Sequence, residues 1–60
     1  MCELSVYMTD NEELVMEGVV RLMVSGEKIL LEDIIGRSLE ITGRIKEINI
    51  TVQKALIDPV

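Results

Sequence analysis

The fold is decided by residues 19–32, which read VVRLMVSGEKILLE. Val20, Leu22 and Val24 alternate with Arg21, and this period of two is typical of a strand with one buried face. Residues 25–28 supply the glycine and polar side chains of a hairpin loop. Residues 29–32, an apolar run of three that ends in Glu32, then give the returning strand. The stretch therefore predicts an antiparallel β-hairpin.

The same alternation extends over most of the chain. Between residues 2 and 9, apolar residues occupy every second position, at Cys2, Leu4, Val6 and Met8. The positions between them are Glu3, Ser5, Tyr7 and Thr9. Residues 9–12 are turn formers, and we expect a second strand over residues 13–17 that ends at Gly18. Residues 39–46 predict one further strand, and a turn is expected at residues 47–49. The last strand begins at residue 50 and ends before Pro59.

A helix over residues 12–23 is the main competing interpretation, because Leu14, Val15, Val19 and Leu22 also fit a helical stripe. Gly18 and the valines favour strands instead, since β-branched side chains suit a pleated surface. We therefore predict a single all-β domain over residues 1–60. Five or six short strands in this length suggest a small antiparallel barrel or sandwich.

Size and apolar content indicate a homodimer. A chain of 60 residues buries only about 60% of its unfolded surface, so its own core is marginal. One cysteine cannot form an internal disulfide, which leaves a metal or a partner subunit as the stabilising element. Val19 and Met23 lie on the opposite phase from Val20 and Leu22, so apolar side chains occupy both faces of one strand. A twofold interface would cover the surplus.

The charge argues against several classes of function. The chain carries 11 acidic and six basic residues, a net charge of −5. An acidic, unclustered surface does not suit nucleic-acid phosphates, and Tyr7 alone gives no stacking platform. The sequence shows neither a secretion leader nor an apolar run of about 18 residues. We expect a soluble cytoplasmic protein with no membrane association.

Catalysis is not expected. The chain has no histidine, and no GxSxG, HExxH or P-loop pattern is present. The thiol of Cys2 has an acidic neighbour, Glu3, rather than a base or cation that would lower its pKa. The adjacent acidic pairs at residues 12–13 and 32–33 would point to opposite faces of a strand, so we interpret them as solvated carboxylates.

Cys2 is the candidate metal ligand. The Met1 amine, the Cys2 amide nitrogen and the Cys2 thiolate are three donors within two residues. Removal of Met1 would leave the Cys2 amine and thiolate as a smaller chelate. Planar sets of nitrogen and sulfur donors suit Ni(II) or Cu(II), whereas zinc favours a tetrahedral set. The alternative is an ordinary buried thiol, because a free cysteine behaves as a small hydrophobe.

Three stretches of the sequence carry a resemblance to a known family, and they are Met1-Cys2, SGEKILLEDI at residues 25–34 and ITGRIKEIN at residues 41–49. With them the chain resembles, over nearly its whole length, the CooT-like family of small nickel-binding proteins. The resemblance implies a small SH3-like barrel that forms a homodimer, with Ni(II) held between two N-termini by the cysteine that matches Cys2. It also implies a role in maturation of carbon monoxide dehydrogenase.

The expected function is that of a cytoplasmic Ni(II) buffer or metallochaperone. Its expected partners are a second copy of the chain and a nickel-enzyme maturation protein or carbon monoxide dehydrogenase. The alternative is a metal-free SH3-like interaction module that binds RNA or a protein partner through its surface.

Overall fold

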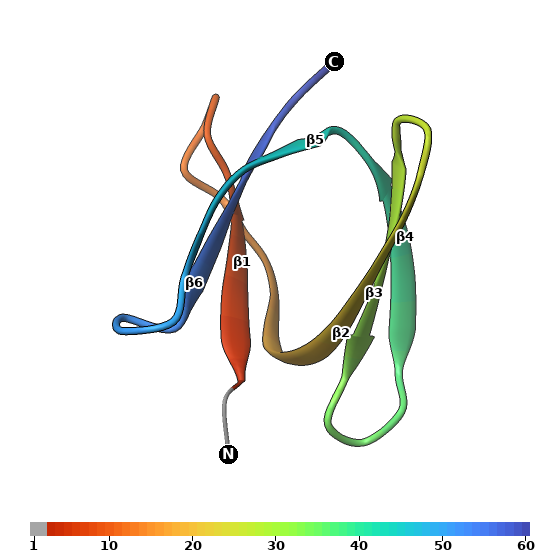
Figure 1. Ribbon diagram of the computed structural model, residues 1–60, viewed down its shortest axis with the longest axis vertical. Helices are drawn as coiled ribbons and strands as arrows, with labels where there is room; N and C mark the ends of the chain where they lie inside the picture. Colours follow the sequence, from red (N-terminus) through yellow and green to blue (C-terminus); the bar gives the residue numbers. More distant parts are fainter. Residues whose placement is uncertain (1–2) are drawn as a thin grey trace.

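The computed structural model describes residues 3–60, which form strands and turns (Figure 1). The strands are β1 (Leu4–Met8), β2 (Leu14–Ser25), β3 (Lys28–Asp33), β4 (Ser38–Thr42), β5 (Arg44–Asn49) and β6 (Lys54–Asp58). They make one six-stranded sheet in the order β4-β3-β2-β1-β6-β5. The all-β prediction is confirmed. Within the described part of the chain there is no helix long and apolar enough to cross a membrane.

The long strand β2 connects the two halves of the sheet. Its first part pairs with β1 and its second part with β3, both antiparallel, and Figure 1 shows it sweeping from one side of the molecule to the other. The prediction of two strands separated at Gly18 was wrong, because Gly18 takes a φ of 69° within a continuous strand. Register shifts beside Leu4, Val6 and Val19 bend the sheet at this point.

The barrel is open, and its pairing is mixed. Strand β1 pairs with β6 in parallel, which corrects the prediction of a purely antiparallel sheet. Strands β4 and β5 follow each other in sequence but lie at opposite ends of the strand order. The sheet is therefore curled without being closed, and these two strands are its edges.

The core lies on the concave face of the sheet. The buried apolar side chains alternate along their strands, as the period of two requires, and they are Leu4, Val6, Val19, Ile29, Leu31, Ala55 and Ile57. Val20 was predicted to share the buried face, but Val19 is buried and Val20 is exposed. The register shift that follows Val19 explains the change of phase.

The turns were predicted with mixed success. The turn after β1 and the hairpin at residues 26–27 are confirmed, and β6 ends at Asp58, just before Pro59. The expected single strand over residues 39–46 is divided at Gly43, which is buried against β6. The turn expected at residues 47–49 lies at residues 50–53, where Gln53 has a φ of 57°.

Candidate functional site

The predicted metal ligands Met1 and Cys2 lie outside the described residues 3–60. The structure describes the chain immediately after them. Leu4 is buried opposite Val19, and the Ser5 amide donates a 2.9 Å hydrogen bond to the Gln53 carbonyl. The first strand is therefore anchored within two residues of Cys2.

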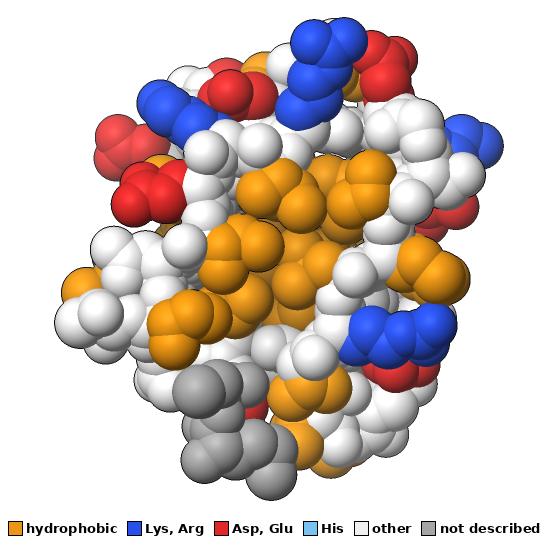
Figure 2. Space-filling view, viewed as in Figure 1, with side chains coloured by type: hydrophobic (Ala, Val, Ile, Leu, Met, Phe, Trp, Pro, Cys, Tyr) orange, Lys and Arg blue, Asp and Glu red, His pale blue; other side chains and the backbone are white. Residues whose placement is uncertain are grey.

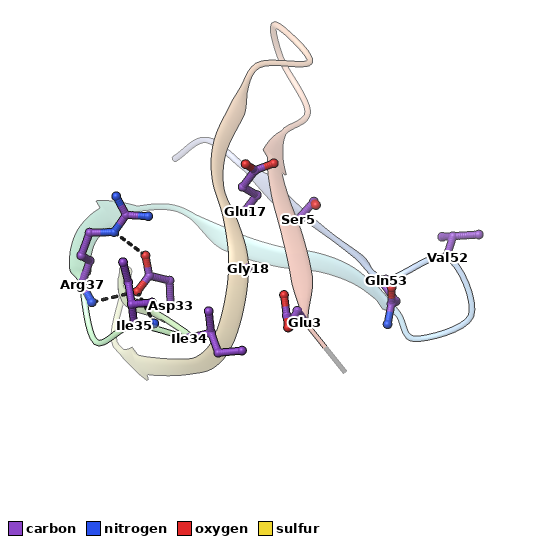
Figure 3. Close-up of a pocket in the computed structure, with 10 residues that line it drawn as sticks. All are labelled: Glu3, Ser5, Glu17, Gly18, Asp33, Ile34, Ile35, Arg37, Val52 and Gln53. Atoms are coloured by element: carbon purple, nitrogen blue, oxygen red, sulfur yellow. Dashed lines mark hydrogen bonds and ion pairs between the residues drawn. The ribbon is translucent and has the colours of Figure 1, made fainter. Parts of the chain in front are cut away.

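A groove of about 430 Å³ lies at this end of β1. Four segments that are distant in sequence form it: the start of β1, the bend of β2, the turn between β3 and β4, and the turn between β5 and β6. The lining residues are drawn in Figure 3 and are Glu3, Ser5, Glu17, Gly18, Asp33, Ile34, Ile35, Arg37, Val52 and Gln53.

Glu3 and Glu17 bring two carboxylates to the groove. Glu3 and Ser5 flank the buried Leu4, so alternation places both on the outer face of β1. Glu17 comes from the adjacent part of β2, just before Gly18, and points toward β1 in Figure 3. A Cβ at Gly18 would lie 3.8 Å from Oε1 of Glu3, so the Glu3 side chain lies over the glycine.

Asp33 organises the turn that forms one wall of the groove. Its Oδ1 accepts hydrogen bonds from the amides of Ile35 (3.1 Å) and Arg37 (2.8 Å), and its Oδ2 accepts one from Arg37 Nε at 2.7 Å. Burial would raise the pKa of Asp33. Hydrogen bonds from the Arg37 side chain and backbone, the Arg37 charge and the Ile35 amide outweigh it, and the pKa falls below its ordinary value of 3.8.

Asp33 also corrects a sequence interpretation. Glu32 and Asp33 do point to different faces, but Asp33 is buried rather than solvated. The useful signal was an aspartate followed by a short Gly-containing segment, since aspartate often binds nearby turn amides. Glu32 remains partly exposed and lies 3.6 Å from the Arg21 guanidinium.

Isoleucines form an apolar rim on the same turn. The exposed fractions are 47% for Ile34 and 71% for Ile35, and Val52 at the far end of the groove is 58% exposed. In Figure 3, Ile34 lies beneath the bend at Gly18, whereas Val52 projects away from the other lining residues. The groove thus combines acidic and apolar groups.

Side chains of residues 3–60 form no group of three His, Cys, Asp or Glu residues that could hold a metal ion. The groove can instead accept hydrogen-bond donors and cations at Glu3 and Glu17, and apolar groups at the isoleucines.

Comparison with known proteins identifies a family. The profile of the family described as "CO dehydrogenase accessory protein CooT" matches residues 1–58. An uncharacterized protein of Methanocaldococcus jannaschii is 36% identical over 58 residues, covering 97% of this chain and 98% of the relative. Another from Archaeoglobus fulgidus is 40% identical over 43 residues, or 72% of this chain and 96% of the relative.

A crystal structure also matches. It is described as that of a CooT from Carboxydothermus hydrogenoformans, and it has a TM-score of 0.89 and 33% identity to this chain. The match covers 98% of each chain, so the six-stranded sheet is shared over essentially its full length.

Proposed function

The chain belongs to the CooT family of CO dehydrogenase accessory proteins, and on that premise we propose that it binds Ni(II). In this proposal the protein buffers the ion or delivers it during maturation of carbon monoxide dehydrogenase. The observation that carries the proposal is the family match, which begins at residue 1 and so includes the one cysteine of the chain.

Met1 and Cys2 supply the donors. The Cys2 thiolate, its amide nitrogen and the Met1 amine can form adjacent chelate rings, and nitrogen and sulfur in one plane suit Ni(II). Without histidine, the chain has no imidazole to compete for the ion. A cytoplasmic location would keep the thiol reduced.

A homodimer is the second part of the proposal, and the open edges of the sheet support it. Leu39 on β4 is paired with the buried Leu31, and Ile45 on β5 with the buried Ile57, so both edge side chains belong to the concave face. They nevertheless remain 39% and 37% exposed. Figure 2 shows apolar side chains gathered at the centre of the face over the opening between the two halves of the sheet.

A second copy would cover this face. A stable interface needs roughly 800 Å² from each subunit, and a contiguous apolar surface on a small protein usually marks a contact site. Two chains could then each give nitrogen and sulfur donors to one Ni(II). The same face would also serve a metal-free module that binds a protein partner. RNA fits it less well, because the net charge is −5.

Nickel titration under reducing, oxygen-free conditions tests the proposal. We expect thiolate-to-nickel absorption bands in the native protein and none in Cys2→Ser, with unchanged circular dichroism. The matched control is the double variant Cys2→Ser/Ser5→Cys, which keeps one thiol but moves it into β1. Equal nickel affinity in the native protein and either variant would show that Cys2 is not a ligand.

A further inference from the structure

The groove at the start of β1 has chemistry that the proposed nickel donors do not use. Three carboxylates and one guanidinium line it. The guanidinium of Arg37 is bound to Asp33, with Nε and Oδ2 2.7 Å apart. Glu3 and Glu17 therefore leave the groove with a formal charge of −2.

These two glutamates differ from several other acidic residues of the protein. Glu27, Glu32 and Glu40 each lie within 4.0 Å of an Arg or Lys nitrogen. Within residues 3–60, neither Glu3 nor Glu17 has an ion pair or a side-chain hydrogen bond. Each can therefore accept a cation from outside this part of the chain without breaking an existing pair.

The apolar rim is held in place by the backbone. The Ile34 amide donates to the Gly18 carbonyl at 2.9 Å, and the Gly36 amide donates to the Asp33 carbonyl at 3.0 Å. Together with the Asp33 side-chain bonds, these fix the turn that carries Ile34 and Ile35. Exposed side chains on a fixed turn lose little conformational entropy when they bind, which favours a contact surface.

We propose that this groove is a docking surface for a segment of a partner protein that presents a lysine or arginine beside apolar side chains. The cationic side chain pairs with Glu3 or Glu17, and the apolar groups pack on Ile34 and Ile35. The proposed homodimer uses the concave face of the sheet, whereas the unpaired glutamates of this groove favour a segment that carries positive charge. The docking needs no nickel, so it is separable from the proposed metal function.

The test uses the metal-free native protein and a synthetic peptide, acetyl-Leu-Lys-Leu-Arg-Leu-amide. We expect amide chemical-shift changes at residues 34–37 and 52–53, and binding that weakens as salt is raised. Glu3→Gln and Glu17→Gln should each lower the affinity for the peptide about two- to five-fold, as expected for solvent-exposed ion pairs. Ile35→Ser should also weaken it.

Two controls separate the groove from general charge attraction. Glu47→Gln removes the same charge from β5, outside the groove, and should leave the affinity within experimental error. A peptide with glutamine in place of both cations should bind at least five-fold more weakly. The proposal is overturned if Glu47→Gln lowers the peptide affinity as much as Glu3→Gln does. It is equally overturned if the amide chemical-shift changes occur outside the groove. It is also overturned if Glu3→Gln and Glu17→Gln only change self-association. None of these results depends on whether Ni(II) binds.

Discussion

Gly43→Ala should be among the most damaging substitutions of one small residue by another in this protein. Gly43 is buried where β4 passes into β5, and its amide donates to the Glu27 carbonyl at 2.8 Å. A Cβ at this position would lie 2.6 Å from Cγ2 of Ile57 and 2.7 Å from the carbonyl oxygen of Asp58. Both distances are far below van der Waals contact, so the chain must move.

The expected loss of folding stability depends on whether the neighbours of the added Cβ can move away. Ile57 is fully buried in the core, and the second obstacle is backbone in β6. Overpacking of a tight site costs about 1–3 kcal/mol of stability. Because both neighbours of the added Cβ are held in place, we expect a cost near ~3 kcal/mol. A 60-residue domain has about 3–9 kcal/mol of stability, so about 3 kcal/mol is a large share. It corresponds to a Tm lower by roughly 12–24 °C.

Thermal and urea denaturation followed by circular dichroism would measure this loss, with Gly26→Ala as the matched control. Gly26 has a φ of 61° but open space around its Cβ position, so alanine there meets only the backbone penalty of about 1 kcal/mol. We expect Gly43→Ala to be the more destabilising by about 2 kcal/mol. A loss no larger than that of Gly26→Ala would refute the argument that β6 blocks this position.

Three further predictions concern the turn, the thiol and the assembly. Asp33→Asn should lower the Tm at neutral pH; because the folded pKa of Asp33 lies below 3.8, its contribution is present above that pH and disappears as the pH falls through the folded pKa. The Tm difference between native protein and variant should therefore shrink between about pH 5 and pH 2, and a constant difference would contradict the assignment. Cys2→Ser should leave the thermal unfolding curve unchanged, and marked destabilisation would identify a buried core thiol instead. Light scattering at micromolar concentration should give a dimer without metal, whereas a monomer with and without Ni(II) would remove the shared site.

The strands could be predicted where one face of the sheet is buried. Leu4 and Val6 in β1, and Ile29 and Leu31 in β3, alternate with polar or less buried residues, and the structure buries all four. The hairpin between β2 and β3 could be predicted equally well, because its turn residues separate two apolar runs. These features depend on local periodicity, which the sequence shows directly.

The errors lie where long-range packing overrides local pattern. Gly18 resembles a strand end, yet β2 continues through it because β1 and β3 pair with it on either side. Gly43 sits in an alternating run, and only the approach of β6 shows why the strand must divide there. The parallel pairing of β1 with β6 joins segments about fifty residues apart, which periodicity does not reveal.

The candidate site shows the same limit. Cys2 could be selected from the sequence because it is the sole cysteine, although it lies outside the described residues. The groove at the start of β1 could not be predicted, because four separate segments form it. Asp33 illustrates the difficulty. The sequence predicts a surface carboxylate, but the structure buries it beneath the turn whose amides it binds.

The most direct test of the central claim compares nickel binding by the native protein and by a form with extra residues joined before Met1. The extension converts the terminal amine into an amide but keeps the Cys2 sulfur and the described fold. Amine, amide and thiol must lose protons to bind, so native affinity should also fall as the pH drops below neutrality. At one pH, we expect the extended protein to bind Ni(II) more weakly and with a changed absorption spectrum. Equal affinity and an identical spectrum would show that the terminal nitrogen is not a ligand and would contradict the proposed site.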